Sequence, residues 1–169
     1  MTVLTAVDGE TIPSKPVREG QTLADQFGEE HVVVHVMPQD VFDDFRESTG
    51  ERPPKYPFQS SASYGGSDRG GQSHAAGSDG YSIDDGERHA AGVARDVVRG
   101  TLDADGAVTL QGRVGEPVEE LLAEAERRDA RYLVIGGRKR TPVGKAVFGS
   151  TTQSVLLTAD QPVLTVMSE

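Results

Sequence analysis

The residues best suited to ligand binding or catalysis lie together in one short stretch, residues 136–152. Glycines at both ends let a backbone approach a ligand closely, because glycine has no Cβ. The run 149–152 (GSTT) opens a predicted helix, where backbone N–H groups and hydroxyls favour a phosphate. Cationic side chains gather in the same stretch, in an otherwise acidic chain: Arg138, Lys139, Arg140 and Lys145. The stretch therefore indicates a site for an anionic ligand.

A purely structural interpretation of this stretch stays open. The cations then pair with an acidic surface, the glycines form turns, and Ser150 only caps a helix. The stretch is not a Walker A loop, because Ala146 occupies the position that requires serine or threonine. Nor does a G-x-G-x-x-G motif follow the first predicted strand.

Short apolar runs alternate with helical patterns along the chain and must position this stretch. The predicted strands are 2–7, 31–37, 107–112, 132–135 and 162–167, and the predicted helices are 17–27, 84–100, 150–159 and one beginning at Pro117, with one or two helical turns in 40–49. We expect Asp84 and Asp85 to cap the second of these helices.

This alternation predicts a five-stranded, parallel, doubly wound sheet with helices on both faces, an open α/β/α sandwich. In that architecture a ligand lies beyond the carboxyl ends of the strands, where the strand order reverses. Asp8, the 37–38 end of the second strand and Gly136 all occupy such ends. Asp8 followed by Gly9 is also typical of a turn without any binding role.

Residues 51–80 have a different composition, rich in glycine, serine and proline and without isoleucine, leucine, valine or methionine. Without aliphatic side chains, burial does not offset the entropy cost of ordering, so we expect a flexible low-complexity insertion. Neither flank carries enough apolar residues for a core of its own, and residues 1–169 are predicted to form a single domain.

The net charge of the chain indicates which classes of binding partner are disfavoured. Asp and Glu number 27 against 17 for Lys and Arg, a formal net charge of −10, and only four of the basic residues are lysines. This negative charge disfavours binding to nucleic acid, whose phosphates are also negative. The lysine-poor acidic composition favours a halophilic source over an ordinary acidic cytosolic protein. No cysteine, membrane-spanning run or basic signal region is present. We therefore expect a cytoplasmic protein that makes no membrane contact.

The remaining candidate residues give weaker evidence for a functional site. His31 and His35 lie about 13 Å apart along one predicted strand, too far to share a metal. Four glutamates of the helix after Pro117 are expected on its solvated face, with Glu124 pairing Arg128 at i,i+4: Glu119, Glu120, Glu124 and Glu126.

The chain resembles the universal stress protein family over nearly its whole length outside 51–80. The resemblance rests on residues 2–9 (TVLTAVDG), 35–36 (HV), 114–117 (VGEP), 133–136 (LVIG) and 162–166 (PVLTV). The nucleotide-binding branch of that family has the motif G-x2-G-x9-G-[ST], which Gly136, Gly149 and Ser150 match at the same spacing. Lys139 replaces the second glycine of the motif. The resemblance implies a Rossmann-like, adenine-nucleotide alpha hydrolase-like fold.

The resemblance also implies roles for individual residues. Val7 and Asp8 look like the pair that contacts the base and ribose, and the backbone of Val36 looks like the group that reads adenine. Ile135 and Gly136 would face the ribose and the first phosphate. The phosphates would be held by Arg138, Lys139, Gly149, Ser150, Thr151 and Thr152.

The function expected is that of an ATP-binding stress-response or regulatory protein, with Mg²⁺ held mainly by the phosphates rather than by a protein metal site. No dedicated base or arginine finger is visible, so we expect no enzyme beyond a slow ATPase. The apolar strand 162–167 is expected at a sheet edge and predicts a homodimer. Two alternatives stay open: a family member that binds no nucleotide and acts as a protein-interaction module, and, less favoured, an adenylyl- or electron-transferring protein of similar fold.

Overall fold

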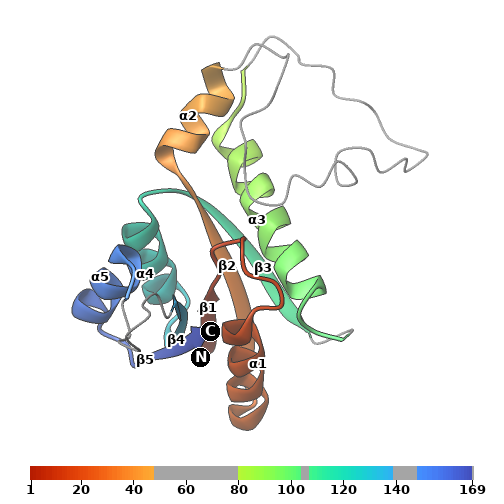
Figure 1. The fold of residues 1–169 in the computed structure, drawn as a ribbon, viewed down its shortest axis with the longest axis vertical. Coiled ribbons are helices and arrows are strands. Elements are labelled where there is room, and N and C mark those ends of the chain that lie inside the picture. Colours follow the sequence, from red (N-terminus) through yellow and green to blue (C-terminus); the bar gives the residue numbers. More distant parts are fainter. Residues whose placement is uncertain (48–79, 104–106, 139–147, 169) are drawn as a thin grey trace.

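The computed structural model describes residues 1–47, 80–103, 107–138 and 148–168. The elements in chain order are β1 (Thr2–Ala6), α1 (Lys15–Phe27), β2 (Glu30–Pro38), α2 (Gln39–Glu47), α3 (Ile83–Arg99), β3 (Val108–Gly115), α4 (Pro117–Arg127), β4 (Ala130–Arg138), α5 (Ser150–Thr158) and β5 (Val163–Ser168) (Figure 1).

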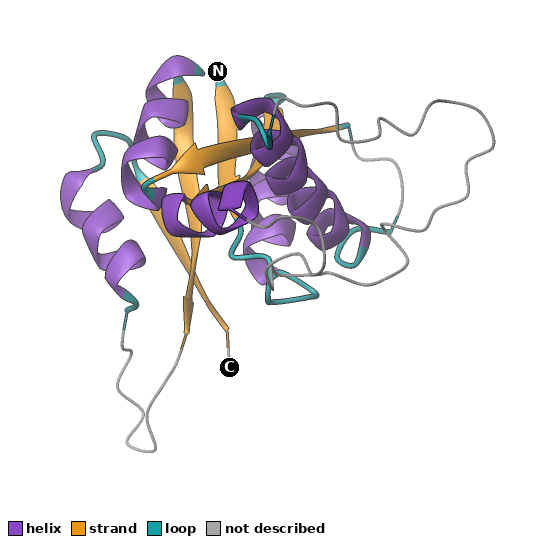
Figure 2. Ribbon diagram, turned by 90° about the horizontal axis from the view of Figure 1, so that it is seen from above, coloured by secondary structure: helices purple, strands orange, loops and turns teal. Residues whose placement is uncertain are grey.

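Within the described residues, five strands form one sheet in the order β3-β2-β1-β4-β5, and every neighbouring pair is parallel. Successive strands step outward from β1 to β3 on one side and from β4 to β5 on the other, so the order reverses between β1 and β4. Figure 2 shows the start of β1, marked N, and the end of β5, marked C, at opposite ends of the sheet. The predicted parallel, doubly wound sheet is confirmed.

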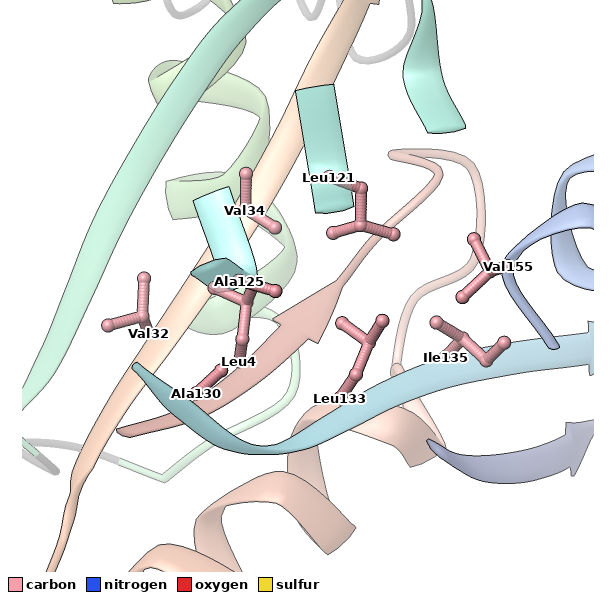
Figure 3. Close-up of a cluster of buried hydrophobic side chains, with 9 residues drawn as sticks. All are labelled: Leu4, Val32, Val34, Leu121, Ala125, Ala130, Leu133, Ile135 and Val155. Carbon is pink, nitrogen blue, oxygen red and sulfur yellow. The ribbon is translucent and has the colours of Figure 1, made fainter. Parts of the chain in front are cut away.

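Helices cover both faces of the sheet (Figure 1). α4 and α5 pack on one face, over a buried cluster shown in Figure 3: Leu4, Val32, Val34, Leu121, Ala125, Ala130, Leu133, Ile135 and Val155. α1 and α3 cover the other face, where Val17, Val33, Ala94 and Val97 form one cluster and Val3, Ala24 and Val134 another. Because side chains alternate along a strand, adjacent valines of β2 pack into clusters on opposite faces of the sheet. Burial on both faces explains why β2 is a continuous apolar run.

One glycine allows α3 to lie close to the edge strand β3. A Cβ at Gly112 would stand 1.9 Å from the carbonyl oxygen of Glu87. Any side chain there would push the helix away from the strand, so glycine is required by space rather than by backbone torsion.

Local sequence signals explain where the helices begin and end. Ser14 caps α1, which carries Pro16 in its first turn and ends at Gly28 in the left-handed conformation, with φ of 65°. The cap of α3 differs from the prediction, which named Asp84 and Asp85. Ser82 is the N-cap, and the Asp85 carboxylate completes a capping box by accepting from the Ser82 backbone N–H.

Element boundaries differ from the predictions by a few residues. β2, β3 and β4 extend beyond the predicted strands, because end residues such as Pro38, Gly115 and Arg138 still pair with neighbouring strands. The helical turns expected in 40–49 form the full helix α2. The prediction of a flexible insertion at 51–80 falls, apart from Gly80, outside the described residues. Within the described part, no helix combines the length and apolar character needed to cross a membrane.

The prediction that Glu124 belongs to a solvated face is wrong. Its side chain is 1 % exposed. Its carboxylate is held by Arg113 of β3 and by Arg127 and Arg128 at the end of α4. Arg113 also bonds Glu87 of α3 at 3.0 Å. The expected i,i+4 pair with Arg128 is present but is one part of a network that links α3, β3 and α4.

Candidate functional site

A pocket of about 700 Å³ opens at the carboxyl ends of β1, β2 and β4, where the strand order reverses. Nine of the predicted site residues line it: Val7, Asp8, Val36, Ile135, Gly136, Gly149, Ser150, Thr151 and Thr152. Arg138 is the last residue of β4, and its side chain, like all of Lys139, lies outside what the structure describes. The pocket is where a doubly wound sheet binds its ligands.

The loop that follows β1 forms the rim of the pocket, and Asp8 organises it. The Asp8 Oδ1 atom accepts hydrogen bonds from the backbone N–H of Glu10 at 2.9 Å and of Thr11 at 3.1 Å. Its Oδ2 atom accepts from the Thr11 hydroxyl at 3.2 Å, and Gly9 has φ of 80°. Asp8 therefore does form the turn that Asp-Gly after a strand indicates, and it lines the pocket as well.

The far end of this loop is fixed to α3. The backbone N–H of Ser14 donates to the Thr101 hydroxyl at 2.8 Å, and that hydroxyl donates to the Val97 carbonyl at 2.6 Å. Both groups are buried. The loop is thus anchored at each end before any ligand is bound.

Backbone contacts connect the ends of β1 and β2 below the rim. The N–H of Val7 donates to the Val34 carbonyl at 3.0 Å, which extends the ladder one residue past β1. The Nδ1 atom of His35 lies 2.8 Å from the Val7 carbonyl oxygen. Burial lowers the pKa of His35, while the hydrogen bond to Val7 and the carboxylate of Asp8 act in the opposite direction. The imidazole is therefore neutral at neutral pH.

Small residues line the opposite wall, where β4 meets α5. The Thr152 hydroxyl donates to the Gly136 carbonyl at 3.0 Å and ties the first turn of α5 to β4. Gly149 is the N-cap of α5, and a Cβ there would meet no atom of the described protein within 4 Å. Gly149 has φ of −63°, so its backbone conformation does not require glycine.

Apolar side chains form the body of the pocket, contributed by Pro16, Val41, Leu121, Ile135 and Val155. The apolar body and the polar rim of hydroxyls and backbone N–H groups together suit a ligand with a flat apolar part and an anionic part. Among the described residues, no group of three or more His, Asp or Glu side chains is arranged to hold a metal ion.

Sequence reasoning missed several residues of the pocket. They are Glu10, Thr11, Ser14, Pro16, His35, Val41 and Phe148, among others. His35 gave only a partial signal, because it is one of two histidines in an apolar strand, and the other, His31, does not line this pocket. The loop residues gave none, since their place depends on contacts with β1 and α3.

A model of the universal stress protein family matches residues 1–167. The chain belongs to the universal stress protein family. The match covers β1 to β4, all of β5 except Ser168, and every residue that lines the pocket, so the predicted resemblance is confirmed at the level of the family.

Individual relatives agree with this assignment. A universal stress protein of Mycolicibacterium smegmatis is 41% identical over 76 residues, which are 44% of this chain and 58% of the relative. The chain thus spans 58% of the length of the curated relative it matches.

Solved structures share the fold at low identity. The hypothetical protein MJ0577 has a TM-score of 0.55 and 14% identity, with 99% of this chain and 96% of that chain covered. A universal stress protein in complex with cAMP has a TM-score of 0.51 and 17% identity, with 100% and 98% covered. These similarities establish the adenine-nucleotide alpha hydrolase-like α/β fold of the chain.

Proposed function

We propose that this chain is a nucleotide-binding stress-response or regulatory protein that takes ATP in the pocket between β1, β2 and β4. The observation that carries the proposal is the assembly of nine predicted site residues, from five separate elements and loops, around one pocket at the switch point of the sheet. A solved universal stress protein of the same fold is a complex with cAMP, which supports an adenine nucleotide as the ligand class.

The residues of the pocket fit such a ligand. The apolar body accommodates an adenine ring, and the backbone of Val36 is the predicted reader of its edge. Asp8 offers carboxylate oxygens to the ribose hydroxyls. The start of α5 offers N–H groups and the hydroxyls of Ser150 and Thr151 to phosphates. ATP would bring Mg²⁺ on its own phosphates, because the described side chains form no metal site of their own.

The proposal assigns binding rather than rapid turnover to this pocket. Asp8 holds the turn of residues 8–11, and the Nδ1 atom of His35 is engaged by the Val7 carbonyl. These hydrogen bonds give both titratable groups a structural role, and in the proposed binding mode Asp8 faces the ribose hydroxyls, whereas fast phosphoryl transfer needs groups positioned on the attacking water and the leaving oxygen. We therefore propose at most slow hydrolysis.

We also propose that the protein acts as a homodimer through β5. β5 is an edge strand of the sheet, and Leu164 on it is 37 % exposed. The neighbouring helix α5 leaves Leu157 80 % exposed. An unpaired apolar edge is a hazard that a two-fold contact between identical strands removes.

The experiment for ATP binding compares two glycines with equal space around them. A Cβ at Gly149 or at Gly92 meets no atom of the described residues within 4 Å, but of the two only Gly149 lines the pocket. In titration calorimetry with ATP and Mg²⁺, Gly149→Val should weaken binding by at least about tenfold through a steric clash, and Gly92→Val should bind like the unmodified protein. Equal affinities in all three proteins would place any nucleotide elsewhere.

The second candidate is an interaction module that binds no nucleotide. Lys139 in place of the motif glycine favours it, as does the exposed edge at β5. No detectable heat at millimolar ATP, with an intact dimer, would favour this candidate over the first.

A further inference from the structure

His35 joins the ends of two neighbouring strands beneath the rim of the pocket. His35 lies on β2 and is 5 % exposed, and its Nδ1 atom lies 2.8 Å from the carbonyl oxygen of Val7. A carbonyl oxygen only accepts hydrogen bonds, so Nδ1 must carry the proton. This defines the tautomer of the buried ring.

This bond fixes the peptide group between Val7 and Asp8. The N–H of Val7 already donates to the Val34 carbonyl, so both backbone groups of Val7 are held by β2. A peptide group is planar, and fixing its carbonyl oxygen also fixes the direction in which Asp8 leaves the strand. Asp8 in turn holds the N–H groups of Glu10 and Thr11.

We propose that His35 is a positioning residue for the pocket: its Nδ1–H bond to Val7 sets the start of the rim loop, residues 8–11, so that the nucleotide meets a preformed wall. The part of the proposal that concerns affinity rests on the proposed function. The part that concerns the order of the rim loop does not, because it can be measured without any ligand.

The second buried histidine of the same strand provides an internal comparison. His31 and His35 lie on the same face of β2, since they are four residues apart. His31 is 1 % exposed and is bonded by the Thr5 hydroxyl and the Gln21 side chain, each at 2.9 Å. It lies at the opposite end of the strand from the pocket. Loss of His31 should therefore cost stability without changing the rim.

The test uses three variants of the full chain. Asparagine carries its amide nitrogen near the place of histidine Nδ1, so His35→Asn keeps the donor to Val7. His35→Leu removes that donor, and His31→Leu removes a buried histidine far from the pocket. For each protein we would measure the exchange rate of the Glu10 and Thr11 amide hydrogens by NMR and the Kd for ATP with Mg²⁺ by calorimetry.

We expect His35→Leu to speed exchange at Glu10 and Thr11 by about tenfold and to raise the Kd by a similar factor, because one hydrogen bond is lost. His35→Asn should stay within about threefold of the unmodified protein in both measurements. His31→Leu should lower the melting temperature and leave both measurements unchanged.

Two results would overturn the proposal. One is unchanged exchange at Glu10 and Thr11 in His35→Leu, and the other is an equal effect from His31→Leu. If His35→Leu does not fold, His35→Gln replaces it, since its amide lies near the place of Nε2 and misses the Val7 carbonyl. If the unmodified protein binds no ATP, the proposed function fails, while the exchange rates still decide the role of His35.

Discussion

The Nη2 atom of Arg113 lies 2.8 Å from the Oε2 atom of Glu124, and this ion pair ties the edge strand β3 to the buried side of α4. Arg127 and Arg128 contact the same carboxylate. Burial by itself raises the pKa of Glu124, but the hydrogen bonds from Arg128 and Arg113 outweigh it and hold the pKa below its ordinary value. The carboxylate is therefore ionised and fully paired in the core.

Removing this carboxylate should be costly. Glu124→Ala leaves Arg113, half-buried between α3 and α4, without its main partner, and we expect a loss of about 3–5 kcal/mol in the free energy of unfolding. Glu126→Ala, on the exposed side of the same helix, should change it by less than about 0.5 kcal/mol. Urea denaturation of both variants measures the difference. Similar values for the two would show that the network contributes little.

Glu124 also shows where sequence reasoning fails. Its position in a glutamate-rich helix is typical of a solvated face, and nothing local marks it as buried. Its burial depends on Arg113, eleven positions earlier in another element, and a contact of that kind is not visible in helical periodicity. The alternation of strands and helices, by contrast, is a local pattern, and it predicted the parallel sheet correctly.

Acid should destabilise the fold through His31. Burial lowers its pKa to about 4, against the opposing effect of Asp25, whereas in the unfolded chain it is near 6.5. Between these values the unfolded chain binds a proton that the folded chain does not. Stability from this residue is therefore complete above about pH 6.5 and falls by up to about 3 kcal/mol as the pH approaches 4.

The variant His31→Gln isolates this effect, since glutamine does not titrate. Its free energy of unfolding should depend on pH less steeply between 6.5 and 4 than that of the unmodified protein. Identical slopes would mean that His31 binds its proton as readily in the folded chain as in the unfolded chain, which contradicts a lowered pKa. Glu124, with its lowered pKa, acts at more acidic pH and is not altered by this variant.

A charge on the edge strand should break the proposed dimer. Light scattering of the unmodified protein should give twice the 18.0 kDa of one chain, and Leu164→Lys should give one chain, because lysine on β5 cannot be buried in a two-fold contact. Ile83→Lys, at the exposed start of α3, is the control and should stay dimeric. A monomeric unmodified protein at micromolar concentration contradicts the dimer.

Salt should stabilise the protein. With 27 acidic against 17 basic residues, repulsion between like charges opposes folding, and added ions screen it. The melting temperature should rise from dilute buffer to molar KCl. A flat or falling curve would remove the halophilic interpretation of the composition.

The candidate site was predictable in part for the same reason as the fold. Gly136, Gly149 and Ser150 stand in a spaced motif, and Asp8 follows a recognisable strand, so their proximity follows from the parallel sheet. His35 and Ser14 were not assigned to the site, because each acts through a partner that is remote in sequence, Val7 in one case and Thr101 in the other.

Binding of ATP in the pocket between β1, β2 and β4 can be followed directly by an NMR titration of the unmodified protein with ATP and Mg²⁺. Saturating nucleotide should shift the backbone amide signals of Asp8, Val36, Gly136, Gly149 and Ser150, and should leave the signals near His31, at the other end of β2, unchanged. Absence of shifts at millimolar ATP, or shifts confined to residues outside the pocket, would contradict ATP binding in this pocket.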